Sequence, residues 1–241
     1  MENFFKVFEQ MKRQGPGSRN TTLKAFEKIP SRKEIKTILE VGCGKGSSSL
    51  VLAENSEALI TAVDNHQPFL DHLKKQVALF GYEKQIFPMN MSMFDLDFPR
   101  PSFDLIWAEG SAYFMGFEKA LKEWRPLING KCFMFVSDAV WLTDQPSTPC
   151  VDYWEIEYPP MTHVKDRKEQ ARKLGYDILS WFILPRQDWK AFYDDMEVCV
   201  NLAIEENGMK QAFEDMIKEI KINRSYGNEY GYLCLLLQRQ D

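Results

Sequence analysis

Residues 38–49 read Ile-Leu-Glu-Val-Gly-Cys-Gly-Lys-Gly-Ser-Ser-Ser, and this stretch decides the fold of the chain. The apolar run at residues 37–41 ends in three alternating glycines, Gly42, Gly44 and Gly46, and a helix-like segment follows at once. Glycine adopts positive φ and has no Cβ, so the backbone can turn sharply and a ligand can approach it closely. The pattern predicts a strand that leads through a tight turn into a helix, whose free N–H groups and dipole suit part of a nucleotide-like cofactor.

The spacing of the glycines and the acid before them indicate the kind of ligand. Dinucleotide enzymes place G-x-G-x-x-G at such a turn to hold a pyrophosphate, whereas this chain has G-x-G-x-G, with Ser47 where the last glycine would stand. Glu40 would repel a pyrophosphate but would attract an ammonium group. A cofactor with a cationic amino-acid end is therefore expected, and S-adenosylmethionine fits. The alternatives are a plain strand–helix turn and a nicotinamide site, against which the spacing argues.

A second acid stands where such a cofactor needs one. Asp64 ends the apolar run at residues 59–63, and it follows the glycines by about 20 residues. In Rossmann-like sheets an acid at this place holds the ribose, since a carboxylate can accept two hydrogen bonds from a vicinal diol. Asp64 could instead cap the helix expected at residues 67–80. Its distance from the glycine loop favours the ribose role, with Asn65 and Phe69 beside the adenosine.

The rest of the chain alternates short apolar runs with helical segments. The expected strands are residues 37–41, 59–63, 85–89, 104–108, 132–136, 177–183 and 230–238. The expected helices are residues 47–53, 67–80, 117–127, 166–174, 189–206 and 210–222. Such alternation is typical of a parallel sheet with helices on both faces. We therefore expect one α/β domain over residues 1–241, with a Rossmann-like, doubly wound, mostly parallel seven-stranded sheet, an antiparallel last strand and a helical insert before it.

Composition narrows the class of protein. The 241 residues carry a net charge of −5 with no basic stripe, which argues against nucleic acid because its binding depends on neutralising phosphates. No apolar run approaches the ~20 residues of a membrane span, and the first residues lack the pattern of a secretory signal. No pair of cysteines has zinc spacing, so no metal site is expected. The scattered cysteines indicate reduced thiols and a cytoplasmic protein: Cys43, Cys132, Cys150, Cys199 and Cys234.

Four stretches together resemble the class I S-adenosylmethionine-dependent methyltransferases. They are the loop at residues 40–46, Asp64, residues 90–93 and residues 103–107, and the similarity covers about residues 36–140. Other stretches resemble a group of bacterial small-molecule methyltransferases akin to the quinone-biosynthesis type, namely residues 12–18, 107–113, 116–118, 123–125, 182–185 and 230–232. This narrower resemblance carries little information on the substrate.

The resemblance implies a role for each matching position. The backbone of the glycine loop would cradle the methionine end of the cofactor, and Glu40 would act near its amino group. Ser92, where many members have Asp, would still accept a hydrogen bond from the adenine amino group. Glu109 and Gly110 would face the sulfonium and the substrate. The resemblance implies that the cofactor is also contacted at the other matching positions, which are Gly42, Cys43, Gly44, Gly46, Asp64 and Met93.

Methyl transfer asks for little covalent help from a protein. The enzyme holds the nucleophile in line with the methyl group and excludes water, and it needs a base only if the nucleophile arrives protonated. Candidate catalytic residues therefore lie where ligands sit in open α/β sheets, at the ends of the fourth and fifth strands: Glu109, Tyr113 and Asp138, with Trp141 beside the substrate. Each has another interpretation, as a carboxylate bonded to loop amides, a core aromatic or the cap of a turn.

Two inserts, residues 141–165 and 185–229, are expected on the substrate side. They carry many aromatic residues, which either pack the inserts onto the sheet or line a pocket for amines or flat phenols. The candidates for substrate contact are Tyr113, Trp141, Tyr153, Trp154, Trp189 and Tyr193. The aromatic insert is also a candidate homodimer surface.

Residues 1–30 are expected to form a helical lid. Phe4, Phe5 and Phe8 fall at helical spacing, and a polar loop with Gly15 and Gly17 follows. We expect this segment to fold over the cofactor with Arg13 or Gln14 near the ligand; the alternative is an ordinary surface linker.

These patterns predict an enzyme that transfers a methyl group from S-adenosylmethionine to a small-molecule acceptor and leaves S-adenosylhomocysteine. The other functions compatible with the sequence are methylation of RNA or protein, a different use of the same cofactor, and a non-enzymatic cofactor-binding module.

Overall fold

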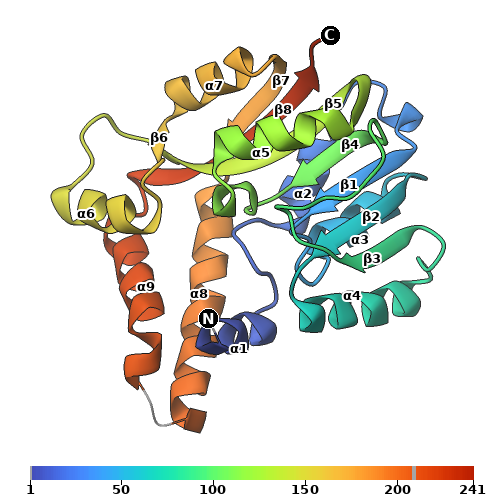
Figure 1. The fold of residues 1–241 in the computed structure, drawn as a ribbon. Helices are drawn as coiled ribbons and strands as arrows, with labels where there is room; N and C mark the ends of the chain where they lie inside the picture. Colours follow the sequence, from blue (N-terminus) through green and yellow to red (C-terminus); the bar gives the residue numbers. More distant parts are fainter. Residues whose placement is uncertain (1, 208–209) are drawn as a thin grey trace.

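The computed structural model describes residues 2–207 and 210–241. Seven strands form one sheet in the order β3-β2-β1-β4-β5-β8-β7, with helices on both faces (Figure 1). The strands are β1 (Thr37–Val41), β2 (Leu59–Asp64), β3 (Ile86–Asn90), β4 (Phe103–Ala108), β5 (Ile128–Trp141), β7 (Tyr176–Ile183) and β8 (Tyr230–Arg239). A two-residue strand, β6 (Thr162–His163), pairs with the end of β5.

The strand directions confirm the predicted fold class. The pairs β1–β2, β1–β4, β2–β3 and β4–β5 are parallel. The last strand, β8, is antiparallel to both of its neighbours, β5 and β7. Because the glycine loop and the loops after β2, β3 and β4 all follow parallel strands, they meet at one edge of the sheet, where ligands bind in open α/β folds.

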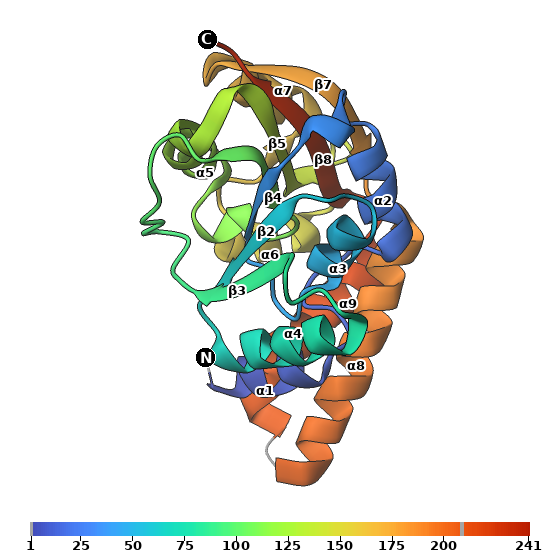
Figure 2. The same cartoon turned by 90° about the vertical axis from the view of Figure 1, so that its right-hand side faces the viewer.

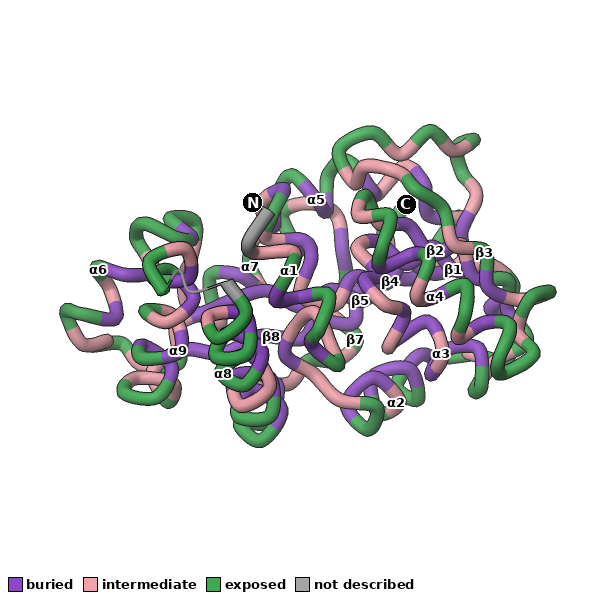
Figure 3. The backbone as a smooth tube through the Cα atoms, turned by 90° about the horizontal axis from the view of Figure 1, so that it is seen from below, coloured by how far each residue is buried: buried purple, intermediate pink, exposed green. Residues whose placement is uncertain are grey.

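Alternation along the strands builds two apolar cores. On β1, Ile38 belongs to one buried cluster and Leu39 to the other, as the two-residue period of a strand requires. One face is covered by α2 (Arg19–Glu27), α3 (Ser47–Glu54) and α4 (Gln67–Phe80), and the other by α5 (Phe117–Trp124) and α7 (Val164–Lys173). Figure 3 shows the buried strands between the partly exposed helices.

Two elements between β5 and α7 were not predicted. Helix α6 (Thr148–Glu157) begins with Pro149, which at the first turn of a helix removes no intrahelical hydrogen bond, although it looks like a helix breaker in the sequence. Strand β6 has two residues, too few to form an alternating pattern. The helix expected at residues 117–127 ends at Trp124 and continues as the 3-10 turn Arg125–Leu127.

The insert helices α8 (Arg186–Asn207) and α9 (Glu214–Tyr226) extend past the edge of the sheet that carries these loops (Figures 1 and 2). The N-terminal helix α1 (Glu2–Gln10) lies against α8, where the rings of Phe8 and Phe192 have centroids 6.3 Å apart. Just after α1, the Lys12 amide donates to Asp195 Oδ2 at 2.7 Å. The N-terminal segment and the insert before the last strand therefore meet beside the loops of the sheet.

Among the helices that the structure describes, none is long and apolar enough to cross a membrane.

Candidate cofactor and acceptor site

A cavity of about 440 Å³ opens at the ends of β1, β2, β3 and β4. Its size lies within the range typical of small-molecule sites. Loops after these strands form one side, and α1 with the segment that follows it forms the other. The predicted site residues that line it are Arg13, Gln14, Gly42, Cys43, Gly44, Asp64, Asn65, Met93, Glu109, Gly110 and Tyr113.

The glycine loop has the backbone conformation that its sequence predicts. Gly42, Gly44 and Gly46 have φ angles of 72°, 53° and 83°. A Cβ on Gly42 would lie 2.5 Å from Ser111 Cβ, so the loop packs closely against the residues after β4. A Cβ on Gly46 would lie 2.1 Å from Leu73 Cδ1, and Gly46 does not line the cavity. Gly46 therefore serves the packing of α3 against α4, a role that the sequence did not predict.

Asp64 is fixed between the glycine loop and the start of α4. Its Oδ2 accepts a hydrogen bond from the Gly44 amide at 2.8 Å, and its Oδ1 accepts one from the His66 amide at 2.9 Å. A carboxylate has about four lone-pair sites, so both oxygens can still accept from the hydroxyls of a ribose. The N-cap of α4 is His66, with no side-chain capping hydrogen bond, so Asp64 holds the turn before α4 and does not cap the helix as the alternative interpretation expected.

Apolar side chains line the cavity near Asp64 and fit an adenine ring. Phe69 of α4 and Met91 and Met93 after β3 lie there together with Phe94. Ser92 does not line the cavity, and its hydroxyl accepts from the Phe94 amide at 3.3 Å. The predicted contact between Ser92 and adenine is therefore not formed by this side chain as it is placed.

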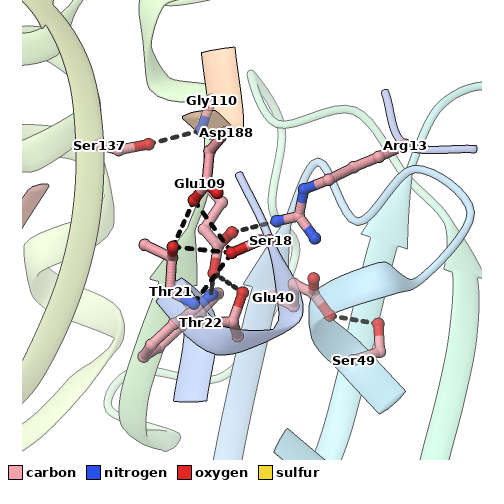
Figure 4. Close-up of polar contacts among 11 residues, drawn as sticks. Arg13, Ser18, Thr21, Thr22, Glu40, Ser49, Glu109, Gly110, Ser137 and Asp188 are labelled. Carbon is pink, nitrogen blue, oxygen red and sulfur yellow. Dashed lines mark hydrogen bonds and ion pairs between the residues drawn. The ribbon is translucent and has the colours of Figure 1, made fainter. Parts of the chain in front are cut away.

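Glu40 lies behind the glycine loop and outside the cavity lining. Its carboxylate is 2% exposed and accepts a hydrogen bond from the Ser49 hydroxyl on α3 (Figure 4). Burial raises the pKa of Glu40 to about 7, against the lowering effect of hydrogen bonds from Ser49 and Ser48. The serines of α3 lie beside Glu40, which could therefore act on a cofactor only through its electrostatic field.

Glu109, at the end of β4, is held by donors from three separate segments (Figure 4). The Arg13 guanidinium pairs with Oε2. The Thr22 hydroxyl donates to Oε1 at 2.8 Å, and the Trp107 indole donates to the same oxygen at 2.9 Å. The next residue, Gly110, donates its amide to Ser137 Oγ at 2.8 Å. The acid is therefore rigidly placed at the cavity wall.

The segment after α1 docks on the glycine loop. Gln14 Oε1 accepts from the Lys45 amide at 3.0 Å, while Gln14 Nε2 donates to the carbonyls of Phe8 and Met11. The Lys45 ammonium donates to the Glu9 and Met11 carbonyls at 2.6 and 2.8 Å, at the end of α1 where a cation is favoured. These hydrogen bonds hold the segment against the cavity, whose lining includes Arg13 and Gln14, and its role as a lid stays a prediction.

A buried acid on α8 anchors the same segment further along. Asp188 is 4% exposed, and it accepts hydrogen bonds from the hydroxyls of Ser18, at 3.0 Å, and Thr21 (Figure 4). Ser18 also caps α2, since its Oγ accepts from the Thr21 amide. The cover is thus tied both to the glycine loop and to the insert.

Asp138 does not take part in the cavity, contrary to its predicted catalytic role. Its carboxylate is fully buried, pairs with Arg167 Nη2 at 2.9 Å, and accepts from the Tyr158 hydroxyl at 2.9 and 3.1 Å. Burial raises the pKa of Asp138 to about 6, and the charge of Arg167 opposes this rise. The pair joins β5 to α7, so the structure gives Asp138 a structural position.

The predicted substrate aromatics also lie outside the cavity lining, except Tyr113. Trp189 packs edge-on against Tyr230 and Tyr232, with centroids 5.6 and 4.7 Å apart, and Trp154 packs against Tyr230 at 4.8 Å. They attach the inserts to β8, which is the packing interpretation of these residues. The predicted residues found away from the lining are Trp141, Tyr153, Trp154, Trp189 and Tyr193.

Several lining residues were not predicted. Phe4, Phe5 and Phe8 of α1 face the cavity, as do Ser48 and Ser111. The helical spacing of the phenylalanines showed an apolar face but not what it would cover. Ser111 directly follows Gly110 and Ser48 stands two residues after Gly46, and this nearness to predicted glycines was the available signal.

Comparisons with known proteins agree with this geometry. Residues 38–129 match the family described as a methyltransferase domain. The fold is similar to that of YjhP from E. coli, with a TM-score of 0.88, 13% identity and full coverage of both chains. It is also similar to a SAM-dependent methyltransferase from Geobacter sulfurreducens in complex with S-adenosyl-L-homocysteine, with a TM-score of 0.84, 14% identity, and 100% and 98% coverage. No curated protein matches the chain.

Fold and site together define a Rossmann-like protein with a cofactor cavity at the switch point of its sheet. With the match of residues 38–129 to a methyltransferase domain, they support an S-adenosylmethionine-dependent methyltransferase of class I, with S-adenosylmethionine as its cofactor. The narrower grouping with the quinone-biosynthesis type stays a prediction.

Proposed function

We propose that this enzyme methylates a small molecule that binds beside Glu109, Gly110 and Tyr113. The observation that carries the proposal is a single cavity lined by both Asp64 and the fixed Glu109, together with Arg13 and Gln14 of the segment after α1. When bound, S-adenosylmethionine supplies a methyl group on a sulfonium. Asp64 would hold the ribose, Met93 and Phe69 the adenine, and Gly42–Gly44 the methionine end.

The chain's own residues would act by position and by excluding water. Arg13 and Gln14 form part of the cavity wall and would help to keep water away from the reacting groups, which favours an in-line displacement. Burial raises the pKa of Tyr113, so its hydroxyl stays protonated at neutral pH and would orient the acceptor as a hydrogen-bond donor. Glu109 already accepts from three donors, so we assign it a positioning role more readily than that of a base.

A covered cavity of this size favours a small acceptor over a macromolecule. The net charge of −5 also argues against RNA. In this proposal residues 1–30 are the lid and residues 36–140 bind the cofactor, while the inserts at 141–165 and 185–229 support the acceptor side from outside the cavity lining. A homodimer through the insert and a cytoplasmic location stay predictions.

A different use of the cofactor is the second candidate. The [4+2]-cyclase SpnF has a similar fold, with a TM-score of 0.75, 19% identity, and 96% and 86% coverage. The fold alone therefore does not decide that a methyl group is transferred.

The test combines binding and turnover. Calorimetry with S-adenosylmethionine, S-adenosylhomocysteine and NAD should show binding of the first two compounds only. The enzyme is then incubated with methyl-labelled S-adenosylmethionine and with separate sets of amines, phenols and thiols. We expect the labelled methyl group to be transferred to compounds of one set. Binding of NAD alone would overturn the cofactor assignment. Product formation without a gain of a methyl group in mass would favour the second candidate.

A further inference from the structure

A single carboxylate, Glu219 on α9, lies among tyrosines from four elements. Burial raises the pKa of each of these hydroxyls, and the charge of Glu219 raises it further. The tyrosines come from the turn after β4, from α6, from α8 and from β8, so distant parts of the chain converge on this acid. We call Glu219 and these residues the tyrosine–acid cluster: Tyr113, Tyr153, Tyr193, Tyr230 and Tyr232.

Glu219 has no cationic partner among the residues that the structure describes. Its one hydrogen bond comes from the Tyr193 hydroxyl, which donates to Oε1 at 2.8 Å. Burial raises the pKa of Glu219 to about 7. Glu219 is half-buried, and a carboxylate that is even partly removed from water is normally paired in proteins. Among the described residues, the acid of the cluster therefore has no ion-pair partner.

Two polar groups in the same place are also unsatisfied. The indole nitrogens of Trp154 and Trp189 are buried, and within residues 2–207 and 210–241 neither has a hydrogen-bond partner. Both rings pack edge-on against Tyr230. Because nearly all buried polar groups in native proteins are hydrogen-bonded, two orphaned donors beside an unpaired acid point to a missing polar ligand.

The cluster borders the cavity through two of its members. Tyr113 lines the cavity itself. A Cβ on Gly110, another lining residue, would lie 3.3 Å from the Tyr232 ring and 3.6 Å from its hydroxyl. The rings also attract cations already, since the Lys218 ammonium lies 5.4 Å from the centroid of Tyr153. A molecule in the cavity thus meets this anionic, aromatic wall on its acceptor side.

We propose that the tyrosine–acid cluster binds an ammonium group of the methyl acceptor, which is therefore a molecule that carries a cationic amine in addition to its acceptor atom. Aromatic faces attract ammonium ions, most strongly when water is excluded, and Glu219 would supply the countercharge. The inference rests on the methyl-transfer function proposed above, and it adds the chemical class of the acceptor. The acceptor atom itself would remain in the cavity beside Gly110.

The test uses tetramethylammonium as the probe and the full chain saturated with S-adenosylhomocysteine at pH 8, where Glu219 is ionised. Binding is followed by calorimetry and by the fluorescence of Trp154 and Trp189, which pack against Tyr230 of the cluster. We expect Glu219→Gln to weaken the binding of tetramethylammonium at least about ten-fold. Glu214→Gln, which alters an exposed acid on the same helix, is the matched control and should leave binding unchanged.

A second variant and a neutral probe keep the inference open to failure. Tyr193→Phe keeps the ring and removes the hydrogen bond to Glu219, and it should weaken binding several-fold even if Glu219→Gln does not fold. The inference is overturned if the wild-type protein does not bind tetramethylammonium, or if the Glu219 and Tyr193 variants bind it as tightly as the wild type does. It is also overturned if the wild type binds neutral tert-butanol as tightly as tetramethylammonium. The affinity for S-adenosylhomocysteine is measured in each protein, because a wild type that does not bind S-adenosylhomocysteine would contradict the proposed function itself.

Discussion

Arg13 and Glu109 are 96 residues apart and form an ion pair at the wall of the cofactor cavity (Figure 4). Their side chains are 18% and 12% exposed, so water screens the pair less than it would at the surface. Through this contact the segment after α1 is attached to the end of β4, and Gln14 attaches it to the glycine loop. The cover and the cofactor loops are thus one physical unit.

Removal of this ion pair should weaken cofactor binding. We expect Arg13→Gln to raise the Kd for S-adenosylhomocysteine about ten-fold, because the cover loses an attachment and Glu109 keeps a partly buried charge. Calorimetry measures the change. Arg19→Gln is the control, since Arg19 pairs with Glu54 where both side chains are about half exposed, and such pairs contribute little. Equal affinities in the two variants would show that the segment is a linker and not a cover.

Asp64 should be the side chain on which cofactor affinity depends most. Asp64→Asn keeps the shape but replaces one accepting oxygen with a donor, so it cannot serve the Gly44 and His66 amides and a ribose together. We expect S-adenosylhomocysteine to bind roughly 10- to 100-fold more weakly. Asp71→Asn on the exposed side of α4 is the matched control. If Asp64→Asn bound S-adenosylhomocysteine with the Kd of the wild type, the role of Asp64 would be limited to its hydrogen bonds with the Gly44 and His66 amides.

Gly46 and Gly81 separate the cost of steric overlap from the cost of backbone conformation. Both have a left-handed φ, 83° and 76°, but a Cβ on Gly46 meets Leu73 at 2.1 Å while one on Gly81 meets nothing within 4 Å. Gly81→Ala should lower the free energy of unfolding by about 1 kcal/mol. Gly46→Ala should cost clearly more, about 3 kcal/mol, since overpacking adds to the strain. Urea unfolding measures both, and Leu73→Ala should recover part of the loss in Gly46→Ala but none in Gly81→Ala.

Glu40 should make the protein less stable as pH rises. The pKa of Glu40 is about 7 in the folded state, whereas its ordinary value is 4.5. Between pH 4.5 and pH 7 the folded state therefore binds more protons than the unfolded state. Stability therefore falls from about pH 4.5 to pH 7 and then levels off. At about 1.4 kcal/mol per pKa unit the loss reaches about 3 kcal/mol. Urea unfolding at pH 5 and pH 8 should show a smaller fall in Glu40→Gln than in the wild type; an equal fall would rule out this origin.

The Asp138–Arg167 pair should matter for stability and not for the cofactor. Asp138→Asn leaves the Arg167 guanidinium buried without its countercharge, which typically costs about 3–5 kcal/mol. We expect a lower Tm and an unchanged Kd for S-adenosylhomocysteine at low temperature. A catalytic role would instead appear as lost turnover with an unchanged Tm.

Predictions from sequence succeeded where a short segment decides its own conformation. Alternating glycines after an apolar run predicted the turn at Gly42–Gly46, and the spacing to Asp64 predicted which acid would face it. The same reasoning mistook the role of Gly46, because Leu73 approaches it from a separate helix. It also placed Asp138 in the site, since a strand end shows where a side chain starts but not what pairs with it.

By itself, the sequence determined the strand–turn–helix unit, the alternation that builds the sheet, and the acid that follows the second strand, because sterics and side-chain periodicity act over a few residues. Only the tertiary structure decided which distant groups share the site. Strand β8 lies between β5 and β7, and this order brings Tyr232 beside Gly110. The packing of remote segments brings Arg13 to Glu109, and within the part of the chain that the structure describes it gives Glu219 the Tyr193 hydroxyl and no cation. Pairing between remote segments sets these contacts, and no local pattern encodes it.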